Sequence, residues 1–85
     1  MPTRTVVGYF PDLEAAEGAR TDLIAAGVAR HRIALRRLAV RDAMAVSDPE
    51  DVAHCEVSVV SEPRDWDRVS ALMARRGARR TVLRR

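Results

Sequence analysis

Two halves of this chain repeat one pattern: a short run rich in β-branched residues, a helical stripe of apolar residues, and a glycine followed by an apolar residue. The runs cover residues 5–10 and 55–60, and the glycines are Gly27 and Gly77. Runs of this kind favour strands, and a glycine behind a helical stripe supplies the left-handed residue that ends a helix. Each half therefore begins as a strand followed by a helix.

The two helices have recognisable starts as well as ends. Asp12, behind Pro11, is placed to cap the first helix through its carboxylate. The second helix begins within residues 61–64, because proline is tolerated in a first turn. The inward positions of both helices follow three- and four-residue spacings. They are Leu13, Ala16, Ala19, Leu23 and Ala26 in the first helix and Trp66, Val69, Ser70, Leu72 and Met73 in the second.

Each half closes with a second extended segment, over residues 32–40 and 79–85. Two strand-helix-strand halves predict a ferredoxin-like βαββαβ fold of the α+β class, because right-handed crossovers leave few other solutions. In this fold a four-stranded antiparallel sheet carries two helices on one face, with the first and third strands central and the other two at the edges. We expect a single domain over residues 1–85. Residues 41–53 form a polar connection with a helical turn near Pro49.

The composition predicts a thin core. Apolar residues make up 47% of the chain, but 14 of them are alanine and 11 are valine. Such a core favours further burial against a second copy or a partner. The single cysteine, Cys55, fits a reducing compartment, and no apolar run approaches the roughly 20 residues of a membrane span. We therefore expect a cytoplasmic protein with no membrane partner.

All 15 basic residues are arginine, and the net charge of +3 is unevenly distributed. Seven of the 15 fall on the two predicted edge strands and none on the central runs 5–10 and 55–60, and charged side chains at an edge hinder sheet-to-sheet aggregation. The alternative is weak binding of nucleic acid or another polyanion without sequence readout, because the central strands offer few aromatic rings for base stacking. The anion-binding candidates are Arg36, Arg37, Arg79, Arg80 and Arg84.

No motif in the sequence indicates a catalytic, metal or cofactor site. His31, His54 and Cys55 lack the spacing of a metal-ligand set, and we interpret Cys55 as a core residue. His54 lies near Asp51 and Ser58 in sequence, but nothing indicates an oxyanion hole beside them. We predict a non-enzymatic protein without cofactors. An enzyme or small-molecule sensor that works in a cavity between sheet and helices stays an alternative.

Five stretches carry a family resemblance: residues 6–16 (VVGYFPDLEAA), 26–27 (AG), 32–35 (RIAL), 57–60 (VSVV) and 73–78 (MARRGA). Through them most of the chain resembles the small bacterial stress-protein domains of the heat-induced YflT type. The resemblance implies a cytoplasmic, non-enzymatic domain linked to stress, with no catalytic residues to carry over. The family is rich in glycine between its central strands, whereas residues 41–53 contain none.

The leading candidate site is the sheet face that no helix covers. Small, apolar and charged side chains on that face suit packing against a second copy, with Arg36 and Glu56 pairing across the contact. We therefore predict a binding or regulatory module that forms a homodimer or larger oligomer, or docks another protein. Residues 42–51 form a separate acidic surface for the arginine edge of a neighbour. The predicted interface residues are Gly8, Ala34, Arg36, Glu56, Ser58 and Val60, with Val6 or Val7 according to register.

Gly8 has two interpretations within the first strand. A glycine there weakens strand pairing but admits close approach of a ligand or another backbone. Alternatively, it leaves room for a bulky neighbour such as Trp66.

Overall fold

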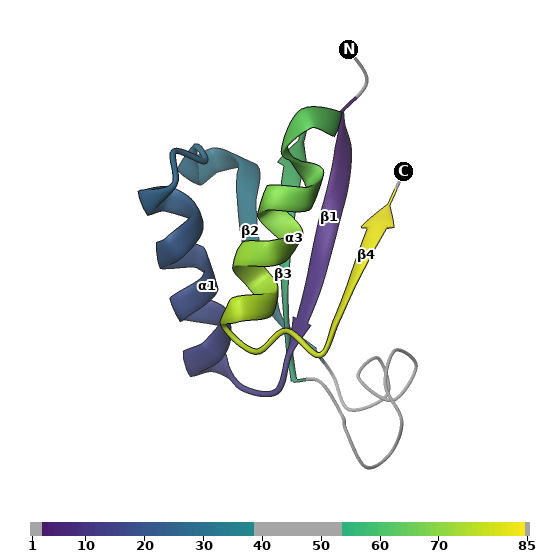
Figure 1. Ribbon diagram of the computed structural model, residues 1–85. Helices are drawn as coiled ribbons and strands as arrows, with labels where there is room; N and C mark the ends of the chain where they lie inside the picture. Colours follow the sequence, from purple (N-terminus) through teal and green to yellow (C-terminus); the bar gives the residue numbers. More distant parts are fainter. Residues whose placement is uncertain (1–2, 39–53, 85) are drawn as a thin grey trace.

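The computed structural model describes residues 3–38 and 54–84 of the chain. Its elements follow one another in the predicted order of strand, helix, strand, strand, helix, strand (Figure 1). Short 3-10 turns precede β2 and α3. The bounds are β1 Arg4–Phe10, α1 Leu13–Ala25, η1 Arg30–Arg32, β2 Ile33–Arg37, β3 Cys55–Ser61, η3 Pro63–Asp65, α3 Trp66–Arg75 and β4 Arg80–Arg84.

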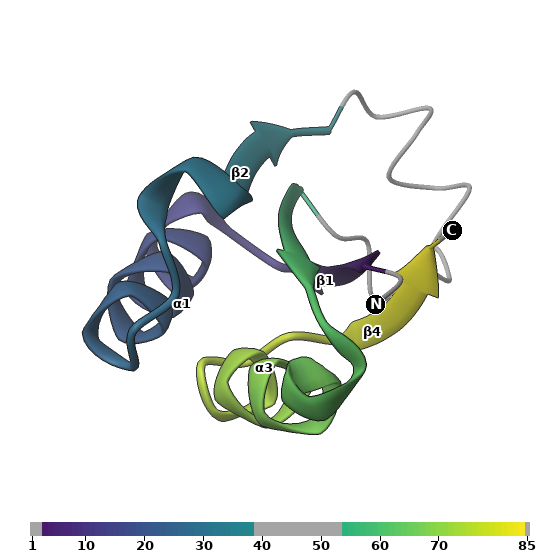
Figure 2. The same cartoon turned by 90° about the horizontal axis from the view of Figure 1, so that it is seen from above.

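The four strands form one antiparallel sheet in the order β2-β3-β1-β4. Both helices lie on the same side of this sheet, as the view from above shows (Figure 2). The fold is therefore ferredoxin-like α+β, with β1 and β3 central and β2 and β4 at the edges, as predicted. Residues 41–53, including the predicted turn near Pro49 and acidic surface 42–51, lie outside the described residues.

Both helices end in the same hydrogen-bonded turn. Gly27 and Gly77 have φ values of 98° and 95°, in the left-handed region that favours glycine. The Val28 N–H donates to the Leu23 carbonyl at 3.0 Å, and the Ala78 N–H donates to the Met73 carbonyl at 3.2 Å. These are Schellman motifs, so the two predicted glycine stops are confirmed.

The helix starts differ from each other. Asp12 caps α1, because its Oδ1 accepts a hydrogen bond from the Ala15 N–H at 2.8 Å, as predicted. Before α3, in contrast, Ser61 is still the last residue of β3, and Glu62 precedes the η3 turn without a side-chain cap. The predicted helix start within residues 61–64 is therefore too early, because the α-helix begins at Trp66. Pro63 instead lies in the first turn of η3, where a missing N–H is tolerated.

The core lies between the sheet and the helices. The alternation of each strand sends one set of side chains toward the helices, and alanines on α1 let that helix approach the sheet closely. Trp66 packs at the margin of this core, where its Nε1–H donates to the Ser61 carbonyl at 3.1 Å. The buried core residues are Val6, Phe10, Ala16, Ala19, Leu23, Cys55, Val57, Val59, Val69 and Met73.

Gly8 faces the helices, which corrects its predicted place on the open sheet face. A Cβ built on Gly8 would lie 2.7 Å from Met73 Sδ and 3.2 Å from Phe10 Cε2. The bulky neighbour is therefore Met73 and not Trp66. The physical reason is strand parity: Gly8 shares its side of β1 with Val6 and Phe10, whose side chains fill the core.

Candidate functional site: the open face of the sheet

The open face is the side of the sheet opposite the two helices. Strand register assigns its residues, because directly paired residues of neighbouring strands project to the same side. Ala34 pairs with Ser58, Arg36 with Glu56, and Glu56 with Tyr9. The described residues of the open face are Thr5, Val7, Tyr9, Ala34, Arg36, Leu38, Glu56, Ser58, Val60, Arg80, Val82 and Arg84.

A polar cluster links all four strands across this face. Arg36 Nε on β2 lies 3.1 Å from Glu56 Oε1 on β3, and Arg84 Nη2 on β4 lies 3.6 Å from Glu56 Oε2. The same Arg84 Nη2 donates a 2.8 Å hydrogen bond to the hydroxyl of Tyr9 on β1. We call these four residues the Glu56 cluster.

Glu56 is the buried member of the cluster. Its side chain is 6% exposed, whereas the side chains of Arg36 and Arg84 are 58% and 49% exposed. Among the described residues, no donor makes a hydrogen bond to Glu56 Oε2. A buried carboxylate is stable only beside opposite charge, which the two guanidinium groups supply. The cluster thus joins both edge strands to the centre of the sheet and leaves the outer sides of two arginines accessible.

Beside the cluster lies a smaller, less polar area. Val60 is 40% exposed, although it is a valine in a central strand. Its neighbours on the same face include Ala34 and Ser58, which pair directly with each other. Leu83 is the other large apolar residue exposed in the described part of the chain, at 43%, but it belongs to the helix side of β4.

Five of the six predicted interface residues share the open face: Ala34, Arg36, Glu56, Ser58 and Val60. Gly8 does not lie on this face. The sequence predicted Val6 or Val7 there, and the structure places Val7 on the open face. Arg36 and Glu56 pair within one chain. Sequence reasoning missed Tyr9 and Arg84 as members of the Glu56 cluster. The hydrogen bond between Arg84 and Tyr9 could not be predicted from the sequence because it depends on the register of β1 and β4.

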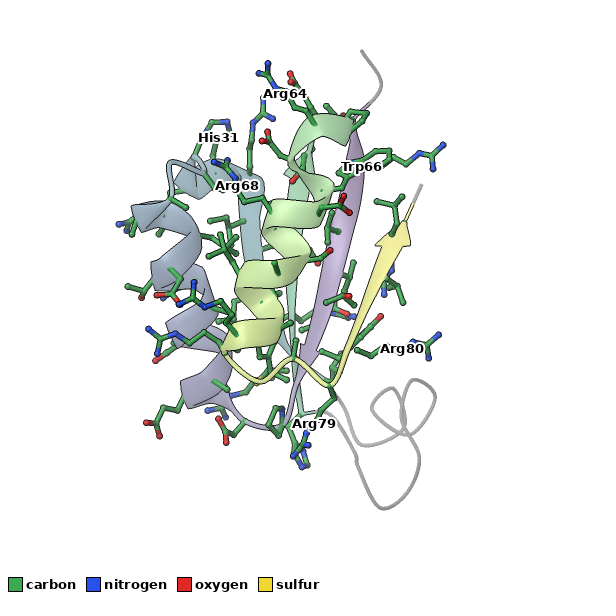
Figure 3. The ribbon with its side chains drawn as sticks, in the orientation of Figure 1. His31, Arg64, Trp66, Arg68, Arg79 and Arg80 are labelled. Carbon is green, nitrogen blue, oxygen red and sulfur yellow. The ribbon has the colours of Figure 1, made fainter. Side chains whose placement is uncertain are left out.

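The five predicted anion-binding arginines do not form one surface. Arg36, Arg80 and Arg84 lie on the open face, but Arg37 pairs in register with Cys55, on the helix side. Arg37 there borders a depression of about 360 Å³ at the start of α1. Arg79 precedes β4, and the Arg79 and Arg80 side chains point in different directions (Figure 3).

The residues considered for metal binding or catalysis are dispersed. Cys55 is buried in the core, and this burial raises the pKa of its thiol. His54 and Ser58 lie on β3 or at its start, and Asp51 lies outside the described residues. Within residues 3–38 and 54–84, no group of three or more histidine, cysteine, aspartate or glutamate side chains is arranged to hold a metal ion. No helix in this part of the chain has the length and apolar character needed to span a membrane.

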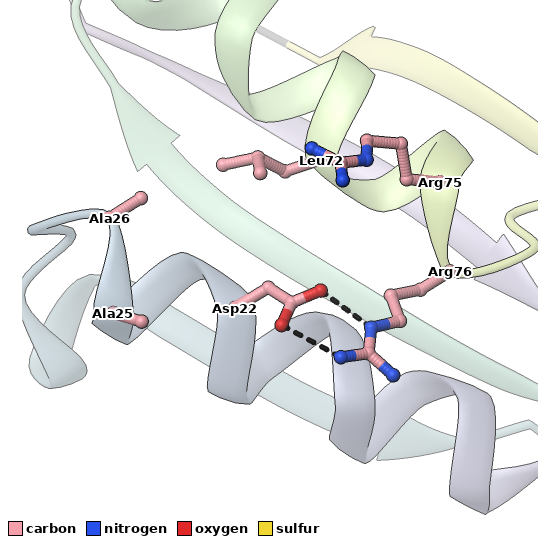
Figure 4. A pocket seen from close by; sticks show the side chains of 6 residues that line it. All are labelled: Asp22, Ala25, Ala26, Leu72, Arg75 and Arg76. Carbon is pink, nitrogen blue, oxygen red and sulfur yellow. Dashed lines mark hydrogen bonds and ion pairs between the residues drawn. The ribbon is translucent and has the colours of Figure 1, made fainter.

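A further depression lies between the two helices (Figure 4). It has a volume of about 560 Å³ and is crossed by a bidentate ion pair, in which Arg76 Nε and Nη2 contact the two Asp22 carboxylate oxygens at 2.5 and 2.9 Å. The hydrogen bonds from Arg76 hold the pKa of Asp22 below its usual value. This pair joins α1 to the residue that follows the last turn of α3.

No family model matches the sequence, and no curated protein or solved structure is significantly similar to it. The resemblance to stress-protein domains of the YflT type therefore stays a prediction.

Proposed function

We propose that this chain is a non-catalytic binding module that self-associates through the open face of its sheet. The observation that carries the proposal is the exposure of Val60 beside Ala34 and Ser58, on the side of the sheet that neither helix covers. Small neighbours allow a second sheet to approach closely, and a two-fold contact would bring the Val60 of each copy into the same apolar centre.

Charge on the open face is compatible with such a contact. Glu56 already has Arg36 and Arg84 as partners within its own chain, so association leaves no unpaired carboxylate at the centre. The long aliphatic stems of these arginines add apolar area around Val60 while their charged ends stay in water. The arrangement resembles the usual interface anatomy of an apolar centre with a polar rim.

Each interface residue contributes only a modest free energy to self-association. Complete burial of a valine side chain contributes about 1.5–3 kcal/mol, so covering the exposed 40% of Val60 contributes about 1 kcal/mol per copy. Association itself costs at least about 4 kcal/mol in lost motion, so Ala34 and the arginine stems must contribute as well. A charge placed at position 60 removes the apolar term and adds the cost of desolvating a carboxylate.

The test is the solution mass, measured by light scattering over a concentration series at low and at high salt. We expect a stable multimer at both salts and a monomer for Val60→Asp. Leu83→Asp is the matched control, because Leu83 is exposed to a similar extent on the opposite side of the sheet. A wild-type monomer at every concentration, or an unchanged mass for Val60→Asp, contradicts the proposal.

A second candidate function is weak binding of a polyanion. Arg36, Arg80 and Arg84 share the open face, where Glu56 is the sole carboxylate among the described residues. Three phosphate contacts to a single-stranded oligonucleotide predict a slope of about −2 in a plot of log affinity against log salt concentration. Fluorescence anisotropy measures this slope. We expect Arg80→Gln to lower its magnitude and Arg20→Gln, on the exposed side of α1, to leave it unchanged.

The physiological role is part of the same proposal. The YflT-type resemblance supports a bacterial, cytoplasmic, stress-linked setting, in which an oligomer of small domains acts by binding and not by catalysis. Comparing the amount of the protein in cells before and after heat shock tests that setting independently of the mass measurement.

A further inference from the structure

A depression at one end of the molecule gathers arginines from three separate elements. Arg32 of η1, Arg64 of η3 and Arg68 of α3 line a cavity of about 250 Å³ between the end of α1 and the start of α3. We call it the arginine pocket. Figure 3 shows Arg64 and Arg68 at this end of the molecule together with His31.

Fold topology creates this gathering. The Schellman turn at Gly27 directs the chain from α1 into η1, while β3 ends beside it and continues into η3. Arg32 and Arg64, which are 32 residues apart in the sequence, therefore border one cavity. Val28 and Val60 add apolar surface to the lining of this cavity.

Two of the three guanidinium groups are held by local carboxylates. Arg64 Nε lies 3.0 Å from Glu62 Oε2, and Arg68 Nη2 lies 3.4 Å from Asp65 Oδ1. Both pairs are partly exposed and therefore weak, since water screens them. They orient the arginine side chains at the rim. An incoming anion can share these guanidinium groups with the carboxylates or take the place of the carboxylates.

Arg32 differs from the other two arginines. Within residues 3–38 and 54–84, no ion pair or side-chain hydrogen bond engages its guanidinium. The lining of the pocket therefore carries three positive and two negative charges, and Arg30 of η1 lies next to it in sequence. This arrangement leaves a net positive charge around a small cavity.

We propose that the arginine pocket binds a small oxyanion, the phosphate or carboxylate group of a metabolite-sized molecule. The planar guanidinium group matches both oxyanions through two parallel hydrogen bonds, and arginines from different elements approach the ligand from different directions. The site is separate from the Glu56 cluster, although Val60 belongs both to the lining of the pocket and to the interface proposed above.

The test is a two-dimensional amide NMR titration of the full chain with inorganic phosphate, at constant ionic strength maintained with sodium chloride. We expect saturable shifts that concentrate on residues around the pocket, such as Gly27, Val28 and Arg32. A second titration with malonate identifies the group: saturation by one anion assigns that chemistry, and saturation by both assigns a general oxyanion pocket.

Variants make the test specific. Arg32→Gln removes one charge-assisted hydrogen-bond donor and should weaken binding about tenfold. Arg68→Gln should have the same effect from a second element. Arg20→Gln is the control, since it removes the same charge from the exposed side of α1 and should leave the affinity unchanged. Unchanged spectra outside the pocket verify that each variant is folded.

Three results overturn the proposal. The first is the absence of saturation with both anions. The second is a set of shifts spread over arginines throughout the molecule. The third is equal weakening by Arg20→Gln and Arg32→Gln, which would indicate only a general response to net charge.

Discussion

Adding a methyl group at Gly8 tests the packing between sheet and helices directly. In the Gly8→Ala variant the new Cβ would lie 2.7 Å from Met73 Sδ, far inside the 3.4–4 Å of ordinary contact. Met73 is fully buried, so its flexible end must move within a packed core. Overpacking of this kind costs about 1–3 kcal/mol, while replacing a strand glycine by alanine gains about 0.5–1 kcal/mol. We expect a net loss of about 1 kcal/mol in the free energy of unfolding.

The companion variant Met73→Val removes two of the three atoms that crowd the new Cβ, Met73 Sδ and Cε, and leaves Phe10 Cε2. By itself it should cost about 2 kcal/mol, because it deletes buried volume. In its background, however, Gly8→Ala should stabilise the protein by about 0.5 kcal/mol, since the alanine methyl group then fills space and only the 3.2 Å contact with Phe10 Cε2 opposes the gain from replacing glycine. The predicted coupling energy between the two positions is therefore about 1.5 kcal/mol.

Urea unfolding followed by the fluorescence of Trp66, the sole tryptophan, measures all four corners of this cycle. Gly18→Ala serves as a control in both backgrounds. Its new Cβ meets only the end of the Arg76 side chain, at 3.3 Å, so the change should stabilise α1 by about 0.5–1 kcal/mol with or without Met73.

A coupling energy below about 0.5 kcal/mol between Gly8 and Met73 would refute the reasoning, because independent positions add within that margin. Such a result would mean that Gly8 does not face the helices. Gly8 would then lie on the open face, and the residues of β1 that now face the helices would face away from them.

Two further predictions concern the ion pairs. Glu56→Gln removes the charge at the centre of the open face, and because both arginine partners are about half exposed we expect a loss of only about 1 kcal/mol in unfolding free energy. Glu62→Gln, whose arginine partner is mostly exposed, should change it by less than about 0.5 kcal/mol, and equal losses in urea titrations would contradict this ranking. The second prediction uses pH. Because Arg76 lowers the pKa of Asp22 in the folded state, the pair stabilises the protein fully above the unfolded value of about 3.8 and loses this effect as the pH falls through the folded pKa. Asp22→Asn should therefore be less stable than wild type at pH 7, with a gap that narrows in acid, and a gap independent of pH would show that the pair has no such role.

Much of the fold was predictable because its signals are local. The carboxylate of Asp12, the glycines at positions 27 and 77 and the apolar spacing of the helices each act within a few residues. The sequence likewise predicted Cys55 in the core and Glu56, Ser58 and Val60 on the open face, and the structure confirms these positions. These features, combined with right-handed crossovers, led to the ferredoxin-like order of elements.

The candidate site was predictable only in part, and two of the errors have one cause. Assigning Gly8 to the open face required the phase of β1 relative to the helices, which its mixture of valine, glycine and aromatic residues leaves ambiguous. The same ambiguity hid the contact between Arg84 and Tyr9, whose positions are 75 residues apart. Pairing between Arg36 and Glu56 was anticipated, but in a contact between copies and not within one sheet.

The sequence by itself thus determined the order of strands and helices, the cap of α1 and the ends of both helices, because capping, glycine conformation and hydrophobic period are properties of neighbouring residues. Only the tertiary structure decided which side of each strand faces outward and which distant arginines meet. Strand register and the path of the chain around the sheet set both, and they depend on the packing of the whole core. The Glu56 cluster and the arginine pocket arise at that level.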